Sequence, residues 1–220
     1  FLSFDPNVRL PLWDSPESCQ AAIREFLPYA DLVKLSDDEV EFCTGCKTER
    51  EAAELLFSQG CRLLLVTRGA GGAAVYTPNA SAETKALPVT VADTTGAGDS
   101  FIGSFLYQLT RDGVTAETLA DIPQEKLADY LTFSSECSAY TVQHKGAVMP
   151  TEEELRMENG EWRMNVEIWH FPFSIWHTRK IKRREHSALS LNTAKGSVLP
   201  FTFCVDISLS ANPSVDLTEL

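Results

Sequence analysis

The feature that most constrains the fold is an alternation of apolar, strand-like runs with amphipathic, helix-like runs over residues 1–155. The clearest strand-like run is CRLLLVTRG, residues 61–69, and the clearest amphipathic run is GAGDSFIGSFLYQLTRDG, residues 96–113. Strands that alternate with helices form mostly parallel sheets, because each helix carries the chain back to the start of the next strand. The sequence therefore predicts an α/β fold with a mostly parallel sheet flanked by helices.

The ends of the expected elements follow from local patterns. Ser15 and Ser36 are expected N-caps, Pro16 suits the first position of a helix, and Gly45 is expected to end one. Strands are expected over residues 1–4, 31–36, 61–69, 72–77 and 85–91, and helices over residues 15–30, 36–45, 49–60, 96–113 and 123–142.

The overall charge and the cysteines limit the functional class. The 220 residues carry a net charge of −12, which argues against a general nucleic-acid binder because such proteins need a basic surface. No run of 18 apolar residues indicates a membrane span, and no secretory leader is visible at Phe1. The six cysteines are scattered, so we expect buried thiols in a reduced, cytoplasmic protein.

The composition changes abruptly near Leu155. Residues 156–220 hold 8 of the 19 basic and 7 of the 31 acidic residues and keep no steady hydrophobic period. We therefore expect an unrelated tail over residues 156–220, either translated out of frame or disordered. Its basic cluster is expected to be a solvated patch. Because a chain rarely starts inside a core strand, we also expect that a segment preceded Phe1, and the hypothesis is a broken or frame-shifted gene.

The stretch VADTTGAGDSFIGSF, residues 91–105, places two glycines and an alanine before a carboxylate at the expected start of a helix. A helix N-terminus carries unpaired N–H groups and a partial positive charge, and small residues let an anion approach them. Gly96, Ala97 and Gly98 are therefore candidates for an anion hole. Asp99 suits a general base that takes a proton from an attacking hydroxyl. The alternative is a glycine-rich turn in which Asp99 only complements the helix dipole.

Other short motifs are weaker. TRGAGGAA, residues 67–74, has the G-x-G-x-x-A spacing of a dinucleotide turn, but strand-like sequence follows where that motif requires a helix. A tight turn that passes close to a nucleotide is the favoured interpretation. SDDE at 36–39 is a capping-box pattern, and CTGC at 43–46 lacks a second Cys or His pair for zinc. No G-x-x-x-x-G-K-[ST] sequence occurs, which excludes a P-loop.

In their order along the chain, these segments resemble the ribokinase-like (PfkB) sugar kinase family. DTTGAGDSF at 93–101 is a close match to the second signature of that family, and FDPNVRLPLW at 4–13 is similar to its fructokinase branch. LVKLSDDEVEFCTG, LLLVTRGAGG and HKGAVMPT occur in the order and approximate spacing of the family. The resemblance covers about residues 1–154. It implies that residues 1–155 are the C-terminal, nucleotide-binding part of a ribokinase-like domain, without the N-terminal half and its lid.

The resemblance also implies roles for individual residues. Asp99 would be the base for the sugar hydroxyl that attacks the γ-phosphate of ATP, and the N–H groups of residues 96–98 would form the anion hole. The other implied contacts are with the nucleotide for Thr67, Gly69, Gly72 and Ser135, with substrate or phosphate for Arg9, with Mg²⁺ through water for Glu39, and with an activating K⁺ for Asp93, Thr95, His144 and Gly146.

Two of these roles stay open at the level of sequence. Glu39 matches the Glu of the family's N-x-x-E motif, but Ser36 stands at the Asn position, so the capping-box and magnesium interpretations are both open. Arg9 can face the substrate, or it can have a structural role at the end of a strand.

The implied function is phosphorylation of a small sugar, foremost fructose, with Mg²⁺–ATP as donor and K⁺ as activator. Ketodeoxygluconate or another sugar is an alternative, because most sugar-selecting residues of the family lie in its N-terminal half. The family's lid often forms a dimer contact, so a homodimer is expected of full-length members. Without that half, the strand at residues 1–4 is expected to expose an apolar sheet edge. A non-catalytic fragment is the main rival, and an NAD-dependent oxidoreductase built on GAGGAA is a third interpretation.

Overall fold

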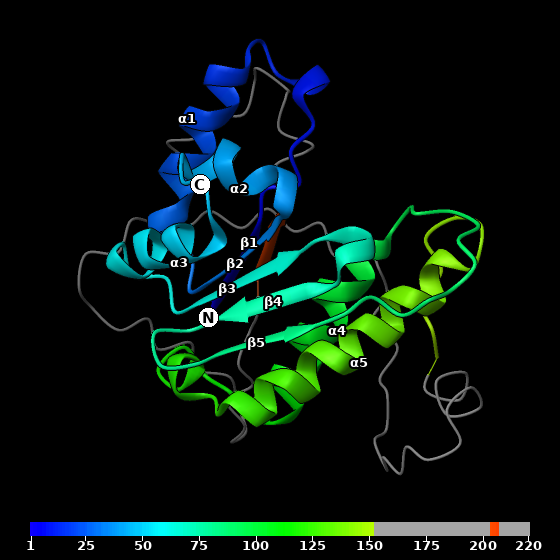
Figure 1. Cartoon of the computed structure of the whole chain (residues 1–220). Helices are drawn as coiled ribbons and strands as arrows, with labels where there is room; N and C mark the ends of the chain where they lie inside the picture. The colour runs from blue at the N-terminus through cyan, green and yellow to red at the C-terminus, as the bar shows by residue number, and fades with distance from the viewer. Residues whose placement is uncertain (152–202, 207–220) are drawn as a thin grey trace, which may run out of the picture.

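The computed structural model of the chain describes residues 1–151 and 203–206. These residues form one six-stranded sheet in the order β5-β4-β3-β2-β1-β6 (Figure 1). The strands are β1 (Leu2–Asp5), β2 (Leu32–Ser36), β3 (Leu63–Thr67), β4 (Ala73–Tyr76), β5 (Ser81–Thr84) and β6 (Phe203–Asp206). The strands β6, β1, β2 and β3 pair in parallel with their neighbours, whereas β4 pairs antiparallel with both β3 and β5. The predicted mostly parallel sheet is confirmed.

Five α-helices among the described residues cover the two faces of this sheet. They are α1 (Pro16–Phe26), α2 (Asp37–Thr44), α3 (Glu49–Ser58), α4 (Ala97–Arg111) and α5 (Gln124–Val142). Helices α1, α2 and α3 lie on one face, and α4 and α5 lie on the other (Figure 1). Within the described part of the chain, no helix has the length and apolar character needed to cross a membrane.

The strands are buried on both faces, which explains their continuous apolar sequence. Side chains alternate along a strand, so in β2 Val33 packs toward α1–α3 while Leu32 packs toward α4 and α5. In β3 the residues Leu63–Val66 are all fully buried. Lys34 is the exception in β2, because it is a charged residue that is only 6% exposed.

The expected helix boundaries are confirmed where capping residues define them. Ser15 is the N-cap of α1 and its hydroxyl accepts a hydrogen bond from the Ser18 N–H at 3.1 Å. Helix α2 follows Ser36 and ends at Gly45, whose φ of +80° lies in the left-handed region that glycine tolerates.

The strand expected over residues 85–91 is wrong. The strand that pairs with β4 is Ser81–Thr84, and no strand is assigned within 85–91. A short hairpin brings residues 81–84 directly beside β4, and Pro88 has no N–H to donate to a ladder. The apolar residues Leu87 and Val91 are exposed in the loop that leads to α4.

The open edge expected beside the first strand is also wrong for the described residues. β6 pairs in parallel with β1 over its whole length, with Leu2 opposite Phe203 and Asp5 opposite Asp206. The backbone groups on this side of β1 therefore take part in a sheet ladder, and β6 takes the place of β1 at the edge of the sheet. The other residues of the predicted tail, and its basic cluster, lie outside the described residues.

Candidate active site

The carboxyl ends of β1, β2 and β3 lie together at one edge of the sheet, where open α/β folds bind their ligands. Asp5 ends β1, Ser36 ends β2, and Thr67 ends β3 directly opposite Ser36 in the ladder. The start of α4 reaches the same edge, because a Cβ built at Gly98 would lie 3.3 Å from Nζ of Lys34 on β2. The fold therefore brings the TGAGD segment to the ends of the parallel strands.

The first turn of α4 has the properties expected of an anion site. Gly96 is the N-cap with a φ of +80°, and among the described residues no side chain caps the helix. A Cβ at Gly96 would lie 2.6 Å from Cβ of Ala147, so glycine is required there by both its conformation and its packing. The Ala97 N–H already donates to the Thr94 carbonyl at 3.2 Å, a long bond that an incoming anion would have to share.

Asp99 occupies the third position of α4 and its side chain is exposed. The next residue, Ser100, is fully buried, and its hydroxyl finds no hydrogen-bond partner among the described residues. Ser138 on α5 donates to the carbonyl of Ala97 at 3.1 Å and so ties the start of α4 to its neighbour. A solvent-accessible carboxylate on a fixed helix start can act as a base toward a bound hydroxyl.

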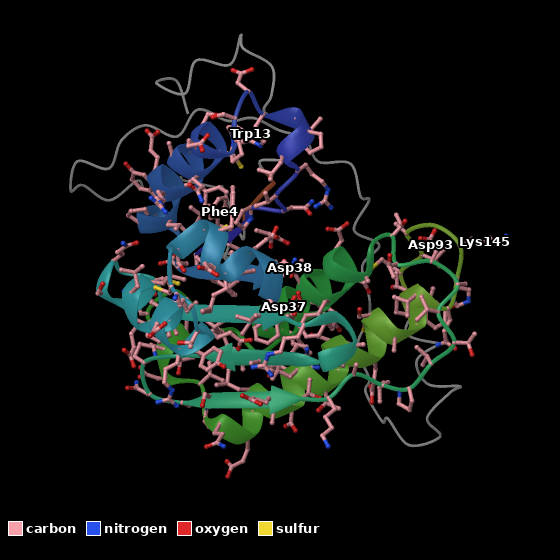
Figure 2. The ribbon with its side chains drawn as sticks, turned by 45° about the horizontal axis from the view of Figure 1, so that its top comes forward. Phe4, Trp13, Asp37, Asp38, Asp93 and Lys145 are labelled. Carbon is pink, nitrogen blue, oxygen red and sulfur yellow. The ribbon has the colours of Figure 1, made fainter. Side chains whose placement is uncertain are left out.

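Asp93 joins two loops beside this helix start. One carboxylate oxygen accepts from the Thr95 N–H at 2.9 Å and from its hydroxyl at 2.7 Å, and the other accepts from the Gly146 N–H at 2.9 Å. These donors lower the pKa of Asp93 to about 2, with the backbone bond from Thr95 as the largest cause. Figure 2 shows Asp93 and Lys145 next to each other.

The structure thus brings together three of the four residues expected around K⁺, namely Asp93, Thr95 and Gly146. The fourth, His144, lies two residues from Gly146, but its Nδ1 is 2.8 Å from the Tyr140 carbonyl and its ring packs on the Tyr140 ring at 4.3 Å. A carbonyl oxygen only accepts hydrogen bonds, so Nδ1 carries the proton. Carboxylate, hydroxyl and backbone oxygens are ligand types that suit a hard cation.

Glu39 has a clear structural role. Its Oε2 accepts from the Ser36 N–H at 2.8 Å, which is the carboxylate half of a capping box, and its Oε1 accepts from the Val8 N–H at 2.7 Å. This carboxylate joins the loop after β1 to the start of α2. The described residues contain no group of three or more His, Cys, Asp and Glu side chains that could hold a metal ion.

Arg9 lies on the same loop after β1, and its guanidinium is exposed and donates to the Val8 carbonyl at 3.0 Å. Asn7 has a φ of +43°, which gives this loop a tight bend.

Figure 2 shows Phe4 and Trp13, which pack on the α1 side of the sheet, and Asp37 and Asp38 at the exposed start of α2.

The turn after β3 is a hairpin turn and not the start of a long helix. Residues Gly69–Gly71 form one 3₁₀ turn, and β4 follows antiparallel to β3, so the dinucleotide interpretation of GAGGAA is wrong. Gly72 has a φ of +94°, and a Cβ there would meet the carbonyl of Thr84 at 2.0 Å. A glycine is therefore required at position 72, because β5 packs directly against it.

Side chains around this turn hold it in place. Arg68 makes two bonds of 2.6 Å to the carboxylate of Glu49, and the hydroxyl of Tyr76 donates to the same carboxylate at 2.7 Å. Such a bidentate pair fixes both distance and orientation. Ser135, the remaining residue expected near the nucleotide, is buried on α5.

Sequence reasoning missed the buried pair of Lys34 and Asp5. Their side chains are 8% and 6% exposed, and Nζ lies 3.0 Å from Oδ2. Burial raises the pKa of Asp5 to about 6, although the opposing Lys34 ammonium lowers it. The available signal was a single lysine inside the strand-like run LVKLS, since lysine is almost never fully buried unless it is paired.

Comparison with known proteins agrees with this geometry. The model of the pfkB family of carbohydrate kinases matches residues 1–154. The chain is 42% identical over 154 residues to "Probable fructokinase-2" of Arabidopsis thaliana, which covers 69% of this chain and 45% of that protein. It therefore spans about half the length of the curated relatives it matches.

Solved structures give the same result. A fructokinase from Vibrio cholerae O395, solved with fructose, ADP and calcium ion, is 34% identical with a TM-score of 0.60, over 70% of this chain and 49% of that one. A double mutant of that enzyme was solved with fructose, ADP and potassium ion. A fructokinase from Xylella fastidiosa with bound ATP is 32% identical with a TM-score of 0.65, over 72% of this chain and 52% of that one. From its fold and from the match over residues 1–154, the chain belongs to the pfkB family of carbohydrate kinases.

Proposed function

We propose that this chain carries the ATP-binding and phosphoryl-transfer part of a kinase that phosphorylates fructose. The observation that carries the proposal is the start of α4, where exposed Asp99 lies in the first turn of a helix whose N-cap is the left-handed Gly96. Fructokinase relatives, one of them solved with fructose and ADP, support the choice of sugar. Ketodeoxygluconate or another sugar is the alternative substrate.

In the proposed reaction, Asp99 takes the proton of a sugar hydroxyl and the hydroxyl oxygen attacks the γ-phosphorus of ATP. A phosphorus–oxygen bond to the sugar forms, the bond from the γ-phosphorus to the bridging oxygen breaks, and ADP leaves. The N–H groups of Gly96, Ala97 and Gly98 stabilise the negative charge of the transferred group. Donors fixed at such a position contribute about 3–4 kcal/mol each to the transition state.

The position of Thr67 supports one of the remaining proposed contacts. Thr67 ends β3 at the ligand-binding edge, and Arg68 holds the turn that follows it. The proposed contacts are with the nucleotide for Thr67, Gly69, Gly72 and Ser135, with substrate for Arg9, with water-bound Mg²⁺ for Glu39, and with K⁺ for Asp93, Thr95, His144 and Gly146. Mg²⁺ and K⁺ would supply positive charge near the phosphates, as expected for phosphoryl transfer.

Thermal unfolding of the full chain tests nucleotide binding. A ligand that binds only the folded state raises the midpoint, so Mg-ATP in KCl should raise it and Mg-NAD should not. Omission of KCl should reduce the shift. If neither nucleotide moves the midpoint of a cooperative transition, the proposal is rejected.

Release of ADP in the presence of fructose tests the chemistry. Asp99→Asn should abolish fructose-dependent ADP release and keep the ATP-induced rise in midpoint, because the base is lost and the nucleotide contacts remain. Asp129→Asn is the matched control, since Asp129 is an exposed aspartate on a different helix, α5, and not at the start of α4. An ATP-specific shift without turnover on any sugar would support the rival, a nucleotide-binding part that is not catalytic alone. The homodimer, the cytoplasmic location and the lack of a nucleic-acid partner stay predictions.

A further inference from the structure

Lys34 is a buried cation near the carboxyl ends of the parallel strands, and it is the one charged residue of β2. It lies on the face of β2 that packs toward α4 and α5, two residues after Leu32, which is fully buried. Its ion pair with Asp5, with 3.0 Å between Nζ and Oδ2, crosses from β2 to the end of β1. The other oxygen of Asp5 accepts from the Asn7 N–H at 3.2 Å, so the carboxylate is held at both ends.

The ammonium of Lys34 lies against the first turn of α4. A Cβ built at Gly98 would be 3.3 Å from Nζ, which is tighter than nine in ten contacts of real Cβ atoms. Glycine at position 98 therefore leaves room for the ammonium and not only for an anion. The backbone of the TGAGD segment and the ammonium are immediate neighbours.

Stability alone gives little reason for a lysine at this position. The ammonium loses hydration on burial, and the adjacent helix N-terminus is also positive. One carboxylate offsets these costs only in part, and buried ion pairs can often be replaced by apolar side chains without loss of stability. A negatively charged ligand at the start of α4 would supply the missing favourable interaction, since lysine acts as a point charge toward phosphate.

We propose that Lys34 is a further catalytic residue, whose ammonium contacts the transferring phosphoryl group together with the N–H groups of the α4 start, and that Asp5 is the positioning residue that orients it. This inference rests on the proposed function, because it assigns a second source of positive charge to the same anion hole. It also gives Gly98 a second role, which is to admit the Lys34 ammonium beside the backbone.

Glycine amide signals in NMR spectra of the full chain test this inference, with inorganic phosphate as the probe. The chain has 12 glycines, so a sample labelled with ¹⁵N at glycine gives few signals, among them Gly96 and Gly98. Phosphate should shift these two signals. Lys34→Met should raise the apparent Kd for phosphate at least about tenfold, or about 1.4 kcal/mol. Lys126→Met is the control for the loss of an ion-paired ammonium elsewhere in the fold, because it removes the more exposed ammonium of the Lys126–Asp112 pair.

The possible results separate this inference from the proposed function. If phosphate shifts both glycines equally in the unaltered chain and in Lys34→Met, Lys34 is only structural and the inference fails while the anion hole stands. If phosphate shifts neither glycine in the unaltered chain, the anion hole and the inference fail together. Should Lys34→Met not fold, the double variant Asp5→Asn, Lys34→Met removes both charges and leaves no unpaired carboxylate. An unchanged phosphate response in the folded double variant overturns the proposal.

Discussion

Replacing Gly96 with alanine should destabilise the fold through two separable effects at the start of α4. Gly96 has a φ of +80°, and an alanine in the left-handed region costs about 1–2 kcal/mol. Its Cβ would also lie 2.6 Å from Cβ and 2.9 Å from Cα of Ala147, so the loop must move. Overpacking of this kind costs a further 1–3 kcal/mol or so, which makes the total about 2–5 kcal/mol.

Gly113→Ala is the control that isolates the backbone term. Gly113 follows α4 with a φ of +68°, and a Cβ there would meet no atom within 4 Å. Gly113→Ala should therefore lower the free energy of unfolding only by the cost of placing alanine in the left-handed conformation, about 1–2 kcal/mol. Replacing glycine with alanine also lowers the conformational entropy of the unfolded chain, which favours the folded state. This gain in stability is similar in both variants and cancels in the comparison.

Urea unfolding at pH 7 gives the free energies of both variants, provided that the m-values agree. The expected difference between Gly96→Ala and Gly113→Ala is about 1–3 kcal/mol. Equal losses would refute the reasoning, because they would mean that Ala147 does not pack on Gly96. The same contact holds the loop whose Gly146 N–H binds Asp93, so Gly96→Ala should also weaken any K⁺-dependent stabilisation by ATP.

Three other perturbations test separate parts of the structure. Asp93→Asn should lower the free energy of unfolding at pH 7, because a carboxylate with a lowered pKa stabilises the fold only while it is ionised. The difference from the unaltered chain should vanish as the pH falls from 3.8, the ordinary pKa, toward about 2, the pKa in the folded state. Urea unfolding at several pH values measures this difference. Tyr76→Phe should cost about 1.5–3 kcal/mol, because it removes one hydrogen bond to a charged carboxylate. Glu49→Gln should cost more, because it removes the charge that two bonds from Arg68 and one from Tyr76 share, and thermal unfolding compares the two variants. Leu65→Ala should cost about 2–5 kcal/mol for a cavity in the centre of β3, and a loss below 1 kcal/mol in urea would contradict the burial of this strand.

Local chemistry was sufficient to predict several elements from the sequence. A serine before a helical run defines the start of α1, because its hydroxyl accepts a bond from the first turn. A glycine after α2 defines its end, because the left-handed conformation suits glycine. The glycines and Asp99 of the TGAGD segment were also found from sequence, since a glycine-rich helix start is a local pattern.

Long-range pairing limited what the sequence could predict about the sheet. The expected strand at 85–91 was apolar enough, but a strand needs a neighbour, and the hairpin after β4 gave that place to residues 81–84. In the same way, β1 pairs with residues 203–206, which are about two hundred positions away along the chain. No local pattern indicates such a partner.

The candidate site shows the same division. The sequence determined which residues can do chemistry, because a carboxylate, a glycine or a hydroxyl is recognisable in its own segment. Only the tertiary structure decided that Asp93 binds Gly146, that Ala147 requires a glycine at position 96, and that the Lys34 ammonium lies beside Gly98. Such contacts join segments from different strands, loops and helices. They depend on how β-strands and helices pack in space, and burial then changes the charge and reactivity of the groups that meet there.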